Sequence, residues 1–134
     1  MEVLEARYLL EPQAALLAAK RAGPEIIAAM GKVLAKQGEE IHKGGTGQKE
    51  DLEFHDLIAK ASGNSVLCSV LRVIRTENQI LSYLSLIRKK VGGKLHLDHQ
   101  KILRAIREHD AVKAEEAMKQ HIRFVIQDVE TYLK

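Results

Sequence analysis

The sequence predicts an all-α protein, an antiparallel bundle of about six to seven helices in a single domain. Three observations support this fold class. Apolar residues recur at close to the 3.6-residue period of an α-helix along almost the whole chain, and glycines mark the breaks. Ala, Leu, Ile, Lys and Glu dominate the composition, and only 4% of residues are aromatic. The length of 134 residues is sufficient for one domain with its own core.

The first three helices are expected at residues 2–21, 24–43 and 49–62. A Gly-Pro pair separates the first two, and Pro24 suits the first turn of the second. The stretch GGTGQ at 44–48 predicts a flexible connection, because the Gly-Lys-Ser/Thr of a phosphate-binding loop does not follow it. The third helix is expected to stop at a Ser-Gly-Asn sequence.

The second half of the chain predicts a long helical region over 65–90, interrupted near Arg-Thr-Glu-Asn at 75–78, where Thr and Asn are weak helix formers. The sequence VGG at 91–93 is expected to end this region. Two more helices are predicted at 94–109 and 111–134, and the aspartate between them suits an N-cap.

Charge and cysteine content limit the possible functions. The net charge is +3 and is not concentrated in one block, so it does not by itself predict a nucleic-acid surface. No apolar stretch approaches the length of a membrane span, and the N-terminal residues do not resemble a secretory leader. Cys68 cannot form an internal disulfide and is expected to be a packed thiol. A cytoplasmic location without membrane contact is therefore expected.

Three of the six histidines are predicted to face the core. His55 lies on the apolar stripe of the third predicted helix, with Asp51 one turn before it. His99 and His121 lie on the apolar faces of the last two helices. The remaining histidines fall beside a glycine loop, at a helix junction and before the regular part of a helix.

For any one inward histidine, ordinary hydrogen bonding is the preferred interpretation, because buried polar groups are usually satisfied in that way. Three such rings and a carboxylate favour a divalent metal instead, since neutral imidazoles and carboxylates bind zinc, nickel, manganese or iron(II). The i, i+4 spacing lets Asp51 and His55 reach one ion from a single helix. The predicted metal ligands are therefore Asp51, His55, His99 and His121.

Arg7 lies on the core stripe of the first predicted helix, and two interpretations of it stay open. It could pair with Glu11 or another carboxylate, or its planar guanidinium could clamp the carboxylate of a ligand beside the metal. A pocket with a cation and an arginine would select a small organic anion. Asn64 and Arg75 are expected to add polar contacts to such a ligand, although Asn64 also suits a helix cap.

Three blocks of sequence resemble a known family. They are EARYLLEPQAALLAAKRA near the start, DLEFHDLIAKASGN in the middle and DHQKILRAIREHDAVKAEEAMKQHI toward the end. With them the chain resembles the C-terminal effector-binding domain, the FCD domain, of FadR-subfamily GntR transcription regulators. Many members bind a metal inside the bundle through one aspartate and three histidines, and these map by motif onto the four ligands predicted above. The resemblance further implies a small carboxylate effector and a homodimer.

In such regulators a winged helix-turn-helix module precedes this domain and binds operator DNA. The sequence begins where the effector domain begins, so residues 1–134 are expected to form one ligand-binding domain without that module. An excised domain is preferred over a natural protein that lacks the module. The expected function is therefore the sensing of a small carboxylate effector. Zinc is the preferred ion, with nickel or manganese as alternatives. Operator DNA would be bound only by the N-terminal module, not by this domain.

Three alternative functions remain. A metal-dependent enzyme acting on an organic acid is disfavoured, because there is no His-Glu-x-x-His motif and no carboxylate is expected beside the site to act as a general base. A purely structural dimerisation bundle would show no affinity for small carboxylates. A metal-free member of the same family is disfavoured by the four intact ligand positions.

Overall fold

A computed structural model describes the backbone of residues 2–76 and 78–133, and the side chains of the same residues except 78–83. Within these residues the chain forms helices and no strands. The helices are α1 (Glu2–Arg21), α2 (Pro24–His42), α3 (Gln48–Ala61), α4 (Ser65–Arg75), α5 (Asn78–Arg107) and α6 (Ala111–Leu133). The expected all-α bundle is confirmed, while the predicted helix end at Lys134 lies outside the described residues.

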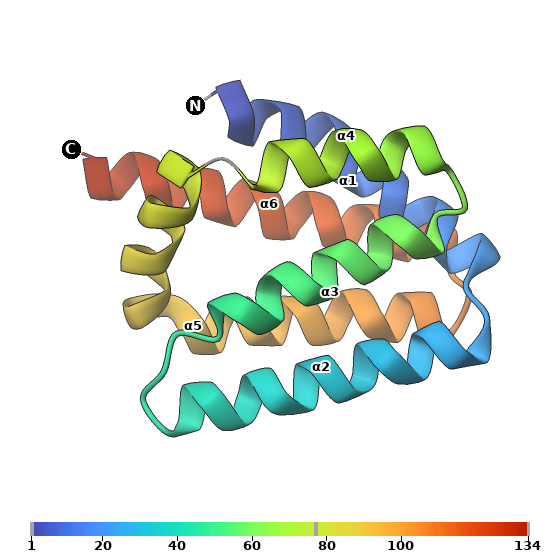
Figure 1. Cartoon of the computed structure of the whole chain (residues 1–134), viewed down its shortest axis with the longest axis horizontal. Helices are drawn as coiled ribbons and strands as arrows, with labels where there is room; N and C mark the ends of the chain where they lie inside the picture. The colour runs from blue at the N-terminus through green and yellow to red at the C-terminus, as the bar shows by residue number, and fades with distance from the viewer. Residues whose placement is uncertain (1, 77, 134) are drawn as a thin grey trace.

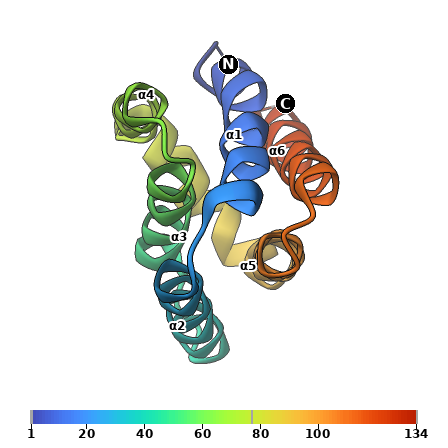
Figure 2. The same cartoon turned by 90° about the vertical axis from the view of Figure 1, so that its right-hand side faces the viewer.

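The bundle is arranged around α1 (Figures 1 and 2). In the end view of Figure 2, α2, α3 and α4 follow one another along one side, and α5 and α6 lie on the other. Helix α1 contacts α3, α4, α5 and α6. Neighbouring helices such as α2 and α3, or α5 and α6, run in opposite directions (Figure 1), as short connections require.

Small residues on α1 allow this close packing. Ala14, Ala15, Ala18 and Ala19 have no exposed surface, so the helices around α1 approach its backbone closely. Larger side chains from the surrounding helices, such as Phe54 of α3, complete the core. Each large apolar side chain that is fully buried stabilises the fold by about 1.5–3 kcal/mol relative to an exposed one. This core holds the inner faces of α3, α5 and α6 in place.

Several predicted helix ends are confirmed. Pro24 begins α2 and Gly63 follows α3 with a φ of 70°, a conformation that glycine adopts without steric cost. The side chain of Asn64 accepts a hydrogen bond from the backbone N–H of Leu67 at 2.9 Å and caps α4. Asp110 accepts one from the backbone N–H of Lys113 at 3.1 Å and caps α6 in the same way.

The expected end of a helix at VGG is wrong. Helix α5 continues through these residues, with a kink at Val91, where φ is −119° and ψ is 15°. A glycine in a helix costs about 1 kcal/mol relative to alanine, which is too little to break a helix that packs well. Gly92 is buried against Ile41 of α2, where an added Cβ would lie 3.5 Å from the Ile41 side chain. Packing therefore outweighs local propensity.

The kink divides α5 into two parts with different directions (Figure 1). The first part crosses one end of the bundle, and the second part runs between α2 and α6. The interruption predicted near 75–78 is confirmed, because α4 ends at Arg75 and α5 begins at Asn78. Among the described residues no helix is long and apolar enough to cross a membrane.

Candidate metal centre

The four predicted ligands lie together in the middle of the bundle. Asp51 and His55 come from α3, His99 from the second part of α5 and His121 from α6. One ligand atom of each residue lies within 4.8 Å of those of the others. No side chain of the four is more than 3% exposed. Side chains far apart in the sequence therefore converge at one buried point.

Each histidine ring is held through its Nδ1 atom by an oxygen of another side chain. His55 Nδ1 lies 2.6 Å from Oε1 of Glu11, and His121 Nδ1 lies 3.2 Å from Oδ2 of Asp98. His99 Nδ1 lies 2.8 Å from Oε1 of Gln37. These oxygens can only accept, so each ring donates an Nδ1–H. In a neutral imidazole that leaves Nε2 without a hydrogen and with a free lone pair.

The free Nε2 atoms crowd around one oxygen of Asp51. His55 Nε2 and His99 Nε2 are 3.3 Å apart, and Asp51 Oδ1 lies 3.4 Å and 3.0 Å from them. Asp51 Oδ1 is buried and makes no hydrogen bond of acceptable geometry. Three electron pairs thus face one another, which is unfavourable without a positive charge between them. Ligand atoms at about 2.1 Å from one ion lie about 3.0–3.4 Å apart, so the donor set fits a divalent metal.

Burial and the neighbouring charges shift the pKa values of these three rings. Burial alone would lower the pKa of His55, but the charges of Glu11 and Asp51 outweigh it and raise the pKa above the ordinary value. Burial lowers the pKa of His99 to about 3, and burial also lowers the pKa of His121. Without a metal, a proton on His55 is therefore the positive charge that the site can accept most readily.

Three buried arginines surround this cluster. Arg88 donates from Nη2 to Asp51 Oδ2 at 2.6 Å, while its Nε and Nη1 atoms are buried without a partner among the described residues. Arg7 pairs through Nε with Oε2 of Glu11, as one of the two interpretations of Arg7 expected. Arg75 approaches the carbonyl of Leu52 at 3.4 Å, and its Nε atom is also buried without a partner. These unpaired N–H groups are donors available to an anion.

The charges of the arginines act on the carboxylates beside them. Burial would raise the pKa of Glu11 and of Asp51, yet both pKa values lie well below the ordinary range. The charges of Arg7 and His55 lower the pKa of Glu11, and those of Arg88 and His55 lower the pKa of Asp51. Three guanidinium groups accompany Glu11 and Asp51, while Asp56 pairs with Arg75 and Asp98 pairs with Lys94 at the edge of the same region.

The family model of the FCD domain matches residues 2–124, and this match decides the family of the chain. The chain belongs to the FCD domain family. Its relatives include the Uxu operon transcriptional regulator of Escherichia coli K12, 38% identical over 94% of this chain and 52% of that protein. The HTH-type transcriptional regulator LutR of Bacillus subtilis is 27% identical over 90% of this chain and 58% of that protein. The chain thus spans about half the length of these relatives.

Solved structures agree with this assignment. A GntR protein of Streptococcus agalactiae is 33% identical over 92% of this chain and 56% of that one, with a TM-score of 0.78. McbR/YncC of E. coli is 18% identical over 98% of this chain and 67% of that one, with a TM-score of 0.85, and shows the shared fold. The relatives are named as transcriptional regulators, in agreement with the expectation that this FCD domain is not an enzyme.

Not every residue predicted to contact the effector lies near the candidate metal centre. Arg7 and Arg75 are buried beside it, but Asn64 is exposed and its side chain caps α4. The expectation that no carboxylate lies beside the site is wrong, because Glu11 contacts His55 directly. Glu11 is engaged by both Arg7 and His55, which does not leave it available as a general base.

Sequence reasoning did not identify Arg88, Gln37 or Asp98 as part of the site. Arg88 follows the buried residues Leu84 and Ile87 on the inner face of α5, at the helical spacing that had marked Arg7. The same search for charged residues on apolar stripes could therefore have found it. The sequence indicates a buried role for Gln37 and Asp98 less clearly, because a single polar residue on a helix is usually exposed to solvent.

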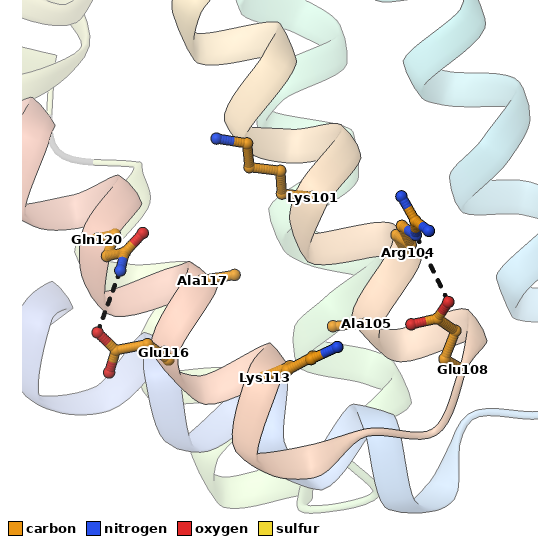
Figure 3. A pocket seen from close by; sticks show the side chains of 8 residues that line it. All are labelled: Lys101, Arg104, Ala105, Glu108, Lys113, Glu116, Ala117 and Gln120. Atoms are coloured by element: carbon orange, nitrogen blue, oxygen red, sulfur yellow. Dashed lines mark hydrogen bonds and ion pairs between the residues drawn. The ribbon is translucent and has the colours of Figure 1, made fainter.

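A separate groove between α5 and α6 differs from this centre (Figure 3). Its lining carries both charges, with Lys101, Arg104 and Lys113 beside Glu108 and Glu116. Arg104 of α5 pairs with Glu108 just after the end of that helix, and Gln120 donates to Glu116 within α6. These polar side chains lie at the surface and the two pairs satisfy one another, so the groove offers no converging donors comparable to those around Asp51.

Proposed function

We propose that this FCD domain is the effector-sensing part of a GntR-type transcription regulator, and that it binds a divalent metal together with a small organic acid. One observation carries the proposal. Asp51 Oδ1 is buried without a hydrogen bond, 3.0 Å and 3.4 Å from the Nε2 atoms of His99 and His55. A cation at this point would satisfy all of these groups together.

Asp51, His55, His99 and His121 would hold the ion. Zinc is the proposed metal, and nickel or manganese suit the same nitrogen and oxygen donors. When bound, the ion supplies a positive charge and open coordination positions for ligand oxygens. All four residues lie inside the bundle, so their orientation is fixed by packing rather than by flexible loops.

Arg7, Arg75 and Arg88 would bind the carboxylate of the effector. Buried N–H groups of Arg75 and Arg88 that have no partner among the described residues support this role, because leaving such a donor unpaired costs about 1–3 kcal/mol that a carboxylate oxygen would recover. A guanidinium also matches a carboxylate with two parallel hydrogen bonds. Arg88 replaces Asn64 in the predicted ligand set, since Asn64 caps α4 at the surface.

The signal would pass through helix packing. The ion would tie α3, α5 and α6 together, and an acid that enters its open positions would change how these helices pack. The matching regulators are about twice as long as this chain. We therefore propose that a winged helix-turn-helix module precedes the domain in the whole protein. That module would bind operator DNA in the cytoplasm, as part of a homodimer of the FadR subfamily.

A purely structural bundle is the alternative to sensing. It would use the same ion for stability alone and would not need free donors beside it. Three guanidinium nitrogens of Arg75 and Arg88 have no partner in the described part of the chain, and they favour the sensor, because a structural core rarely retains buried donors without partners.

Metal analysis and calorimetry test the proposal. The purified protein should contain about one divalent ion per chain, and His99→Ala and His121→Ala should lose it. His42→Ala is the matched control, because His42 is exposed at the end of α2. Titration with lactate, citrate, other small dicarboxylates and sugar acids, with and without a chelator, should identify an acid whose binding requires the metal. Unchanged metal content in the His99 and His121 variants would contradict the assignment.

A further inference from the structure

The three histidine rings share an arrangement that extends beyond the four ligands. Each ring directs Nδ1 to an oxygen on a different helix, namely Glu11 on α1, Gln37 on α2 and Asp98 on α5. Helices α1 and α2 supply no ligand themselves. We propose that Glu11, Gln37 and Asp98 are positioning residues that keep Nε2 of the three rings unprotonated and available to one ion. This inference rests on the proposed metal site.

The uniformity of the three contacts supports this role. A histidine that is buried for structural reasons alone needs a protein partner on each nitrogen. Here Nδ1 of every ring meets an oxygen of a residue outside the four proposed ligands, while Nε2 of His55 and Nε2 of His99 face each other and Asp51, which are themselves proposed ligands. Which nitrogen of an imidazole binds a metal is set by the hydrogen bond of the other nitrogen. The three acceptors therefore select the same tautomer in all three rings.

Each acceptor is itself fixed by a second group. Gln37 is the most constrained, because its Nε2 donates to the carbonyl of Gly47 at 3.1 Å and its Oε1 must therefore face His99. Glu11 uses Oε2 for Arg7, which leaves Oε1 for His55.

Asp98 follows the same pattern near the surface. Its Oδ1 accepts from Lys94 at 2.6 Å, which leaves Oδ2 for His121. A chain of contacts thus runs from each ring to a group outside the cluster. Through these chains a metal bound at the centre would connect α1 and α2 to α3, α5 and α6. Five of the helices would then be coupled to the ion.

Zinc affinity, measured by competition with a chelator, tests the role of the acceptors. Gln37→Met and Asp98→Ala should each weaken zinc binding by about 10–100-fold. Glu11→Gln should do the same, because its amide oxygen would turn to Arg7 and its NH₂ group, which cannot accept, would face His55. Gln37→Glu retains an acceptor for His99 and should recover most of the affinity lost in Gln37→Met. Asp56→Asn is the control, because this carboxylate lies on α3 directly after His55 but pairs with Lys60, Arg72 and Arg75 instead of a histidine.

The ring nitrogens of the metal-free protein give a second readout that does not depend on zinc. Burial lowers the pKa of His99 and of His121, so at a pH well above the ordinary histidine pKa each ring should carry a single proton that ¹⁵N chemical shifts can locate. The proton should lie on Nδ1 in the wild type, and Gln37→Met should move the His99 proton toward Nε2. Circular dichroism identifies any variant that is unfolded, and Asp98→Ala, beside the half-exposed Lys94, is the one that disturbs the core least.

The two readouts separate this inference from the proposed function. If the wild type binds zinc and all three variants bind it equally well, the positioning role is refuted while the metal site stands. If the wild type binds no zinc, the metal site is refuted, and the ¹⁵N shifts still decide whether the acceptors set the tautomer. Protons on Nε2 of His99 and His121 in the wild type would overturn the inference under either result.

Discussion

Arg88 and Asp51 form a buried ion pair in which Nη2 of the arginine lies 2.6 Å from Oδ2 of the aspartate. The side chains are 2% and 3% exposed. This contact gives the two oxygens of Asp51 different environments, because Oδ2 meets a guanidinium and Oδ1 faces two histidine nitrogens. Asp51 therefore belongs to the proposed metal centre and to the proposed anion site together.

Removal of Arg88 should strongly destabilise the metal-free protein. Arg88→Met leaves Asp51 Oδ2 buried without its partner, and breaking a buried pair from one side costs about 3–5 kcal/mol. Urea denaturation in the presence of a chelator measures this loss. Arg72→Met is the control, because the Arg72 side chain is 55% exposed and its pairing with Asp56 is worth at most about 1 kcal/mol. Equal losses in the two variants would contradict the special role of Arg88.

Zinc should stabilise the domain, and a chelator should reverse the effect. An ion present at about 100 times its dissociation constant contributes about 2.7 kcal/mol to the folded state. For a domain of this size that corresponds to a rise of about 10 °C in Tm. Scanning calorimetry with and without added zinc measures the shift. His121→Ala should abolish it, and His42→Ala should leave it intact; a shift that persists in His121→Ala would place the ion elsewhere.

Asn64→Ala should reduce stability without altering metal binding. The side chain of Asn64 caps α4 through the N–H of Leu67, and loss of an N-cap costs about 0.5–2 kcal/mol. Asn64→Asp keeps an acceptor and should retain most of this stability. Thermal denaturation gives the cost, and zinc titration gives the affinity. A loss of zinc affinity in Asn64→Ala would show that this residue contributes to the site after all.

The sequence allowed the prediction of features that depend on helical periodicity. Asp51, His55, His99 and His121 all lie on apolar stripes of regular helices, and a stripe that faces the core in one helix meets those of its neighbours. The break at Gly63 and the two caps follow from local chemistry in the same way. These features require no knowledge of which helices are adjacent.

Features that depend on the relative position of two helices could not be predicted in this way. The Nδ1 contacts of His55 and His99 with Glu11 and Gln37 join residues 44 and 62 positions apart. The continuation of α5 through VGG likewise depends on packing against Ile41 of α2. Local propensity at Gly92 favours a break, and only the tertiary contact decides otherwise.

Gly47 should be more sensitive to substitution than the glycines of the α5 kink. It has a φ of 70°, which costs a residue with a side chain about 1–2 kcal/mol. An added Cβ would also lie 2.9 Å from Cγ of Gln37, the side chain that holds His99. Gly47→Ala should therefore lower both the free energy of unfolding and the affinity for zinc, because Gln37 must move.

Gly93→Ala is the matched substitution in α5. A Cβ at Gly93 would meet no atom within 4 Å, and the residue does not have a positive φ. Because alanine forms helices better than glycine, this variant should be as stable as the wild type or more stable by up to about 1 kcal/mol. Urea denaturation and chelator competition compare the two variants directly. If Gly47→Ala retained wild-type zinc affinity, a rigid Gln37 would not be needed to hold His99.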